Sequence, residues 1–172
     1  MRCLHGAGAL LLLVPRRLAW LCALGWTAVI LFAGHSRALG TGMELWRLYL
    51  KNTGHALLFG VLALWMALCL PRSRGWPVID SFGVRHVLAG VLVVAIADES
   101  QQMLFAARDA SLLDVLTDLT GAGCTLWIVA YLAWPTARER GLWRRLAISS
   151  GLCALAGATA TLVPLVLSFA WL

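Results

Sequence analysis

Long apolar stretches dominate this sequence and most constrain how it can fold. A helix needs about 20 apolar residues to cross the hydrocarbon core of a bilayer. The 172 residues are 61% hydrophobic and only 13% charged, which is too apolar for a soluble domain of this size. We therefore predict an all-α fold, a polytopic membrane bundle of about five transmembrane helices that forms one domain over residues 1–172. The predicted spans are residues 18–34, 54–70, 86–106, 113–135 and 147–172.

The cationic residues lie mainly between these spans, and their distribution predicts the orientation of the bundle. If the N-terminus is cytoplasmic, the outer segments hold four cations: Arg37, Arg47, Lys51 and Arg108. The cytoplasmic segments then hold ten: Arg2, Arg16, Arg17, Arg72, Arg74, Arg85, Arg138, Arg140, Arg144 and Arg145. This bias predicts a cytoplasmic N-terminus and an outer C-terminus. It also accounts for the net charge of +6 without a nucleic-acid partner.

The segments between the spans are predicted to be loops. Residues 35–51, 72–85 and 137–146 are more polar than the spans that they join. Within the first loop, residues 43–50 carry Trp46 and Tyr49 among charges, which is typical of a segment lying at the membrane interface. The five cysteines show no paired metal-ligand spacing, so we expect them to be packing residues, and no cofactor is predicted.

The acidic residues are concentrated in one part of the chain. Of eight Asp and Glu residues, five fall between positions 98 and 118. Four of these five lie inside predicted spans: Asp98, Glu99, Asp114 and Asp118. Ionisable groups within a bilayer are costly unless they face a bundle interior or an aqueous cavity, so they usually mark a functional site.

Helical spacing predicts how these side chains face one another. Glu99 and Gln102 share one helix face, whereas Asp98 should point about 100° away from Glu99. Ser111, Asp114 and Asp118 share a face of the next helix, and a tight connector makes the two helices antiparallel neighbours. The two polar faces can then meet toward the outer leaflet, with Arg108 at the tip of the hairpin and His55 near the start of an earlier span.

The same residues carry a resemblance to a known family. From Glu99 to Gly121 the chain reads E-x2-Q-x5-R-x2-S-x2-D-x3-D-x2-G. This resembles the signature of VanZ-like membrane proteins, E-x2-Q-x5-R-x2-S-x2-D-x3-N-x2-G, over roughly residues 20–135. His55 matches the His of the family's D-K-x-x-H element, although Lys51, Asn52 and Asp118 depart from the usual Asp, Lys and Asn. The resemblance implies a multi-pass protein of the bacterial cytoplasmic (inner) membrane, in a family whose named member is associated with teicoplanin resistance.

Several functions are compatible with this constellation. We expect a site that binds an envelope lipid headgroup, a lipid-linked precursor or a glycopeptide, besides the membrane lipids around it. Its binding residues would be His55, Glu99, Gln102, Arg108, Ser111, Asp114 and Asp118. An intramembrane enzyme is the alternative, with Glu99 or Asp114 as acid or base on a lipid-linked substrate. A proton-coupled transporter is a third possibility, against which the lack of a visible inverted repeat argues. The oligomeric state is not predicted.

Each of these residues also has a purely structural interpretation. Glu99, Gln102 and Asp114 could form an interhelical hydrogen-bond clamp, and Arg108 could neutralise them. Ser111 and Asp114 have the S-x-x-D spacing of a helix N-cap. His55 could bond to a neighbouring helix, and Gly121 and Gly123 are more simply helix-packing residues than a phosphate cradle. A metal held by His55, Glu99, Asp114 and Asp118 lacks the usual ligand spacing, so no metal is predicted.

Overall fold

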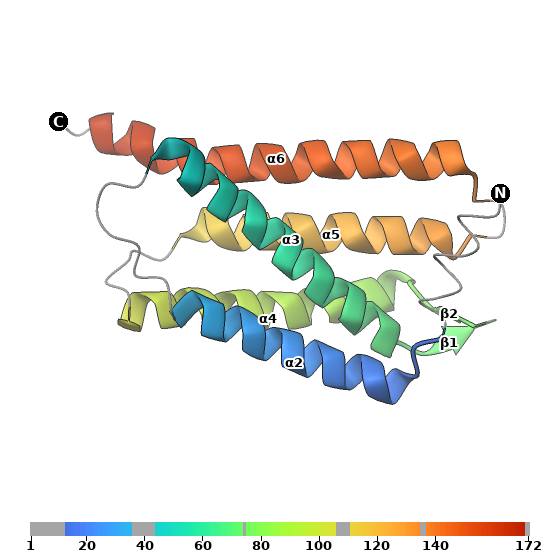
Figure 1. The fold of residues 1–172 in the computed structure, drawn as a ribbon. Coiled ribbons are helices and arrows are strands. Elements are labelled where there is room, and N and C mark those ends of the chain that lie inside the picture. The colour runs from blue at the N-terminus through green and yellow to red at the C-terminus, as the bar shows by residue number, and fades with distance from the viewer. Residues whose placement is uncertain (1–12, 36–43, 74, 106–110, 135–136, 171–172) are drawn as a thin grey trace.

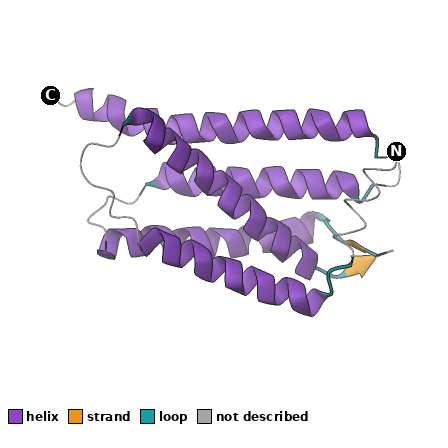
Figure 2. Ribbon diagram, in the orientation of Figure 1, coloured by secondary structure: helices purple, strands orange, loops and turns teal. Residues whose placement is uncertain are grey.

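The protein is a helical bundle with one short β-hairpin (Figures 1 and 2). The computed structural model describes residues 13–35, 44–73, 75–105, 111–134 and 137–170. In these residues the helices are α2 (Arg16–His35), α3 (Leu45–Cys69), α4 (Ser81–Phe105), α5 (Leu112–Leu132) and α6 (Glu139–Ala170). The all-α bundle predicted from the apolar stretches is confirmed.

Four of these helices, α3, α4, α5 and α6, are long and apolar enough to cross a membrane. Large apolar side chains also cover the outside of the bundle, for example Leu57, Val93 and Leu155, each more than 60% exposed. A water-soluble protein would not expose so much apolar surface, whereas acyl chains cover it without cost. The chain is therefore a multi-pass membrane protein. The use of α2 as a further span remains a prediction.

Helix α3 lies at the centre of the fold and crosses the other helices obliquely (Figure 1). Its Phe59 and Leu62 are completely buried and belong to one core with Val91 of α4 and Ala122 of α5. Helices in a bilayer gain little from apolar burial, so close backbone approach at small residues matters more.

Two glycines allow α3 to approach its neighbours closely. A Cβ on Gly121 of α5 would lie 1.9 Å from the Ala56 carbonyl oxygen of α3. On α6, a Cβ on Gly157 would lie 2.2 Å from Thr53 Oγ1 of α3. The predicted packing role of Gly121 is confirmed. The same prediction for Gly123 is wrong, because a Cβ there would meet nothing within 4 Å.

A buried polar contact joins α6 to α3. Asn52 Nδ2 donates to Thr161 Oγ1 at 3.1 Å, and the Thr161 hydroxyl donates to the Gly157 carbonyl oxygen at 2.7 Å. Both side chains are almost fully buried. Hydrogen bonds of this kind fix the register of helices that have only apolar surfaces otherwise.

Two of the predicted loops are shorter than expected because helices extend into them. Helix α3 begins at Leu45 and includes residues 45–50, which were predicted as an interfacial loop segment. Helix α6 begins at Glu139 and includes most of the predicted loop 137–146. Arg, Leu, Lys and Glu are good helix formers, so a helix continues past the edge of its apolar stretch. Hydropathy marks the part of a helix that suits hydrocarbon, not the end of the helix.

The third predicted loop, residues 72–85, is also partly ordered. Strands β1 (Arg72–Ser73) and β2 (Trp76–Pro77) pair antiparallel, and α4 already begins at Ser81. Gly75 takes a φ of 86°, which suits a turn that reverses the chain over so few residues.

Arginines connect this hairpin region to α2. Arg16 Nε donates to the Cys69 carbonyl oxygen at 3.1 Å, which satisfies an acceptor at the C-terminus of α3. Arg72 Nη2 donates to the Val14 carbonyl oxygen at 2.5 Å. Arg16 of α2 thus also closes the end of a neighbouring helix.

The two ends of the bundle differ in charge. At one end α2 and α4 finish while α3 and α5 begin (Figure 1), and we call this the acidic end because the polar cluster described below lies toward it. The described cations near it are Arg47 and Lys51. The opposite, basic end carries the larger described set: Arg16, Arg17, Arg72, Arg85, Arg138, Arg140, Arg144 and Arg145.

Candidate functional site

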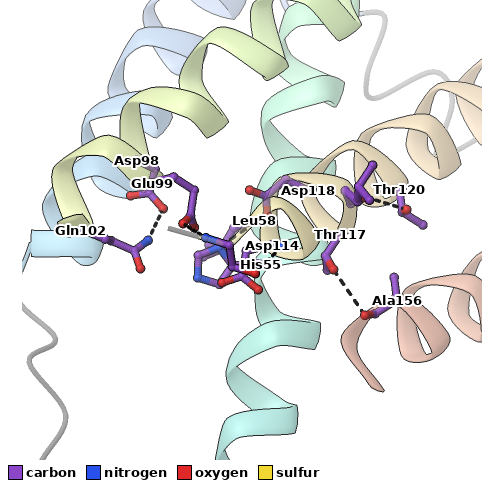
Figure 3. Close-up of polar contacts among 12 residues, drawn as sticks. His55, Leu58, Asp98, Glu99, Gln102, Asp114, Thr117, Asp118, Thr120 and Ala156 are labelled. Atoms are coloured by element: carbon purple, nitrogen blue, oxygen red, sulfur yellow. Dashed lines mark hydrogen bonds and ion pairs between the residues drawn. The ribbon is translucent and has the colours of Figure 1, made fainter. Parts of the chain in front are cut away.

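Polar side chains from three helices converge inside the bundle (Figure 3). We call them the polar cluster: His55 of α3, Asp98, Glu99 and Gln102 of α4, and Asp114 and Asp118 of α5. Asp98 and Asp118 are each only 1% exposed, and Glu99 and Gln102 are nearly as buried. Two contacts agree with the prediction that the polar residues of α4 and α5 meet close to His55: Glu99 contacts Ser111, and Asp118 contacts His55.

His55 faces Asp118 across the α3–α5 interface. Its Nδ1 lies 3.5 Å from Asp118 Oδ1, a separation at which a protonated imidazole and a carboxylate form an ion pair. The imidazole also stacks on Phe59, one turn further along α3, with ring centroids 6.4 Å apart. Because α3 begins at Leu45, His55 lies about 15 Å along the helix from its start.

Asp98 belongs to the polar cluster, contrary to the prediction that it points away from the stripe containing Glu99. Gln102 Nε2 donates to Asp98 Oδ2 at 2.8 Å, one helical turn apart. The most buried positions of α4 include Val91, Ala95 and Asp98, so the centre of the buried face runs through Asp98. Glu99 lies at one border of this face. The prediction failed because it took Glu99 as the centre of the buried face of α4. The apolar residues of this helix fit a face centred on Asp98 equally well.

Glu99 holds the beginning of α5. Ser111 is the N-cap of α5, and its hydroxyl accepts the Asp114 N–H at 3.3 Å, as the S-x-x-D spacing predicted. The Ser111 N–H donates to Glu99 Oε2 of α4 at 3.0 Å. In a capping box that backbone N–H is satisfied by the third residue of the same helix. Here the acceptor comes from the neighbouring helix, so one carboxylate both caps α5 and joins it to α4.

Several buried carboxylate oxygens have no hydrogen-bond partner among the residues that the structure describes. They are Asp98 Oδ1, Glu99 Oε1 and both oxygens of Asp118, of which Oδ1 has only the ion-pair contact with His55 Nδ1 at 3.5 Å. A buried polar atom without a partner costs about 1–3 kcal/mol, and more when it is charged. Such oxygens need a donor from a ligand or solvent, or a proton on the carboxylate itself. The cluster therefore has spare acceptor capacity in the bundle interior.

Of the two remaining predicted site residues, the structure describes Asp114 but not Arg108. Asp114 is half-buried in the first turn of α5, where the helix dipole favours a negative charge. Arg108, predicted at the tip of the hairpin, lies outside the described residues. Its part in the site stays a prediction.

The polar cluster does not have the form of a metal centre. Within the described ranges, no three or more His, Cys, Asp or Glu side chains are grouped so that they could hold a metal ion. The four carboxylates are distributed along two helices, and Asp98, Glu99 and Asp118 have different polar neighbours.

Asp98 is the main residue that sequence reasoning missed. The spacing of Asp98 and Gln102, four residues apart, was the available signal, because side chains at that separation meet on a helix. Asn52 is the second residue whose role was missed. It lies three residues before His55, yet it bonds to Thr161 of α6 and not to the polar cluster. No signal in the sequence indicates that contact, which depends on the placement of α6.

Comparisons with protein-family models, with curated proteins and with solved structures find no match for this chain.

Proposed function

We propose that this multi-pass membrane protein is of the VanZ-like type and that its polar cluster binds the polar headgroup of an envelope molecule. The ligand would be a lipid headgroup, a lipid-linked precursor or a glycopeptide, and its binding could confer glycopeptide (teicoplanin) resistance. The motif from Glu99 to Gly121 supports the family assignment, and the buried unpaired oxygens of the polar cluster carry the functional part.

The acceptor-rich character of the polar cluster narrows the ligand chemistry. Asp98, Glu99 and Asp118 offer carboxylate oxygens and no hydrogen donors when ionised. Such a site favours hydroxyl or amine groups, as sugars and aminated peptides present, over a bare phosphate. The saccharide of a lipid-linked precursor, or the sugars and amines of a glycopeptide, therefore fit better than a phosphate alone. Any phosphate on the ligand would need Arg108.

The charge distribution supports access from the outside. The basic end carries most of the described cations, and cation-rich ends face the cytoplasm. The polar cluster lies toward the opposite end. Envelope precursors and glycopeptides are met at the outer leaflet, so this orientation agrees with the proposed ligands.

A binding experiment tests the proposal. The purified protein in lipid nanodiscs would be titrated with a polyprenyl-diphosphate-linked disaccharide and, separately, with teicoplanin. We expect at least one to bind, and we expect Glu99→Gln, Asp118→Asn and Arg108→Ala each to weaken its binding about tenfold, the effect of losing one hydrogen bond to a charged group.

Glu44→Gln is the matched control, because Glu44 is an exposed acid at the same end of the bundle that pairs with Arg47. It should bind like the unmodified protein. Equal binding by all four variants, or no binding of either ligand, would reject the proposal.

An intramembrane enzyme is the second candidate, and the His55–Asp118 pair favours it. A carboxylate beside an imidazole orients the ring and stabilises its protonated form, as in many acid–base sites. Glu99 or Asp114 would then be the second titrating group. The test is a covalent change in envelope lipids extracted from expressing cells. That change should disappear with Glu99→Gln and Asp118→Asn but persist with Glu44→Gln, and its absence in every sample would exclude catalysis on these lipids.

A further inference from the structure

A second polar feature lies at the basic end, where α5 finishes and α6 begins, far from the polar cluster. Tyr131 of α5 is fixed there by two hydrogen bonds with one residue. Its hydroxyl donates to the Arg138 carbonyl oxygen at 3.0 Å and accepts the Arg138 N–H at 2.8 Å. A Cβ on Gly141 would lie 2.0 Å from the Tyr131 hydroxyl oxygen, so only glycine leaves room for the ring.

Arg145 of α6 stacks on this fixed ring. Its guanidinium carbon lies 3.8 Å from the centre of Tyr131 and 5.0 Å from the centre of Trp127. Its Nη1 donates to the Gly141 carbonyl oxygen at 3.3 Å. The guanidinium is thus held rigidly by two aromatic rings and a helix carbonyl, an arrangement that suits a planar, always-charged group.

One donor of this guanidinium remains unused. Arg145 Nε is buried and has no acceptor within the described part of the chain. Buried donors in native proteins nearly always have an acceptor, so an isolated one indicates a missing partner. A charged N–H group requires an acceptor with negative charge to offset its desolvation.

A cavity adjoins Arg145. It has a volume of about 270 Å³ and is lined by Trp127, Tyr131, Trp134 and Arg145 with smaller apolar residues. Its size is close to the lower end of small-molecule sites, about 300 Å³, and suits a headgroup better than a whole lipid.

The surroundings of this cavity are basic and aromatic. Arg138, just before α6, and Arg140 and Arg144 in its first turns are exposed, and Glu139 is the one acid between residues 138 and 145. Trp134 and Trp143 are 65% and 69% exposed, as expected for aromatic residues at a membrane interface.

We propose that this cavity binds the phosphate headgroup of an anionic glycerophospholipid. The guanidinium of Arg145, which lines the cavity, donates to a phosphate oxygen, and the glycerol backbone rests on Trp134. The excess of arginine over acid favours a headgroup with net negative charge over a zwitterionic one. The apolar lining and the exposed tryptophans favour a lipid over free phosphate, since they place the cavity beside acyl chains. This inference does not depend on the function proposed for the polar cluster.

Native mass spectrometry of the detergent-purified full chain tests it. Phosphatidylglycerol and phosphatidylcholine would be added separately, and apparent Kd values compared. Phosphatidylglycerol should bind more tightly, and Arg145→Lys should weaken its binding about tenfold, since lysine keeps the charge but lacks the Nε–H group and the planar fork. Arg144→Gln, which removes a charge from the next residue outside the cavity lining, should change the Kd less than about twofold.

Trp134→Ala is a second variant, because this exposed side chain lines the cavity without holding Arg145 in place. It should also weaken phosphatidylglycerol binding, so the proposal remains testable if Arg145→Lys does not fold. Equal effects of Arg144→Gln and Arg145→Lys would show that charge alone attracts the lipid and would overturn the proposal. So would unchanged binding in Trp134→Ala, equal affinity for the two lipids, or displacement of phosphatidylglycerol by millimolar inorganic phosphate.

Discussion

Individual residues decide how negative charge is tolerated inside this bundle. Asp98, Glu99 and Asp118 are each nearly buried, yet each has at least one polar neighbour: Gln102, the Ser111 N–H and His55. These contacts offset part of the desolvation cost but leave acceptor capacity unused. A purely structural clamp would leave fewer oxygens unpaired, which is why we favour a binding site.

The cap that Glu99 provides for α5 gives a prediction at this scale. Glu99→Gln keeps an oxygen that can accept the Ser111 N–H, whereas Glu99→Ala removes it. We expect amide hydrogen exchange at Ser111 to accelerate about tenfold in Glu99→Ala and to stay within about threefold of the unmodified rate in Glu99→Gln. Mass-spectrometric hydrogen exchange in nanodiscs would measure both. Equal rates in the two variants would mean that Glu99 does not hold the start of α5.

The glycines of α5 give a second prediction. Gly121→Ala forces a methyl group against the Ala56 carbonyl oxygen of α3, so the helices must separate. We expect its free energy of unfolding to fall by about 1–3 kcal/mol, the usual range for overpacking. Gly123→Ala is the control, because its added Cβ meets open space and alanine is the better helix former. Reversible unfolding in detergent micelles provides the measurement, and equal stability of the two variants would contradict the α3–α5 packing.

At the scale of elements, α3 connects the polar cluster to the rest of the bundle. It supplies His55 to the cluster, a close approach to α5 at Ala56, and a polar contact to α6 at Asn52. Asn52 helps to position α6 through its hydrogen bond to Thr161.

A double-mutant cycle tests this coupling between helices. Asn52→Ala and Thr161→Val remove the two partners of the 3.1 Å hydrogen bond separately and together. The coupling energy should be about 0.6 kcal/mol, with an upper range near 1.7, as for interhelical hydrogen bonds in other membrane proteins. Asn52→Ala paired with Ser100→Ala should be additive, because Ser100 is exposed on α4 and its hydroxyl donates to the Ile96 carbonyl oxygen of the same helix. A coupling of zero for the first pair would show that the contact does not hold α6.

At the scale of the whole molecule, the separation of charge between the two ends determines which side of the membrane the polar cluster faces. The prediction is that the acidic end is extracytoplasmic. In a variant without native cysteines, Trp46→Cys should react with a membrane-impermeant maleimide in intact cells, because Trp46 is exposed near the start of α3. Arg140→Cys, exposed at the basic end, should react only after the membrane is opened. The reverse labelling pattern would place the polar cluster on the cytoplasmic side and exclude the proposed ligands.

The sequence by itself determined the class of fold and the approximate membership of the polar cluster. Apolar length predicts membrane helices because backbone groups in hydrocarbon must be paired within the segment. Acids within those stretches predict a buried polar cluster because hydrocarbon tolerates no isolated charge. Spacing of three and four residues predicted that Glu99 and Gln102 share a face of one helix and that Asp114 and Asp118 share a face of the next.

The tertiary structure alone decided the rest. A helix continues through polar residues that favour helix, beyond the end of its apolar stretch. Hydropathy therefore placed the beginnings of α3 and α6 several residues too late. The inward position of Asp98 depends on the rotation of α4, which apolar residues all around the helix leave undetermined. The roles of Asn52 and Arg145 depend on where α6 packs. Each residue contacts a side chain on a different helix, and helical spacing predicts contacts only within one helix.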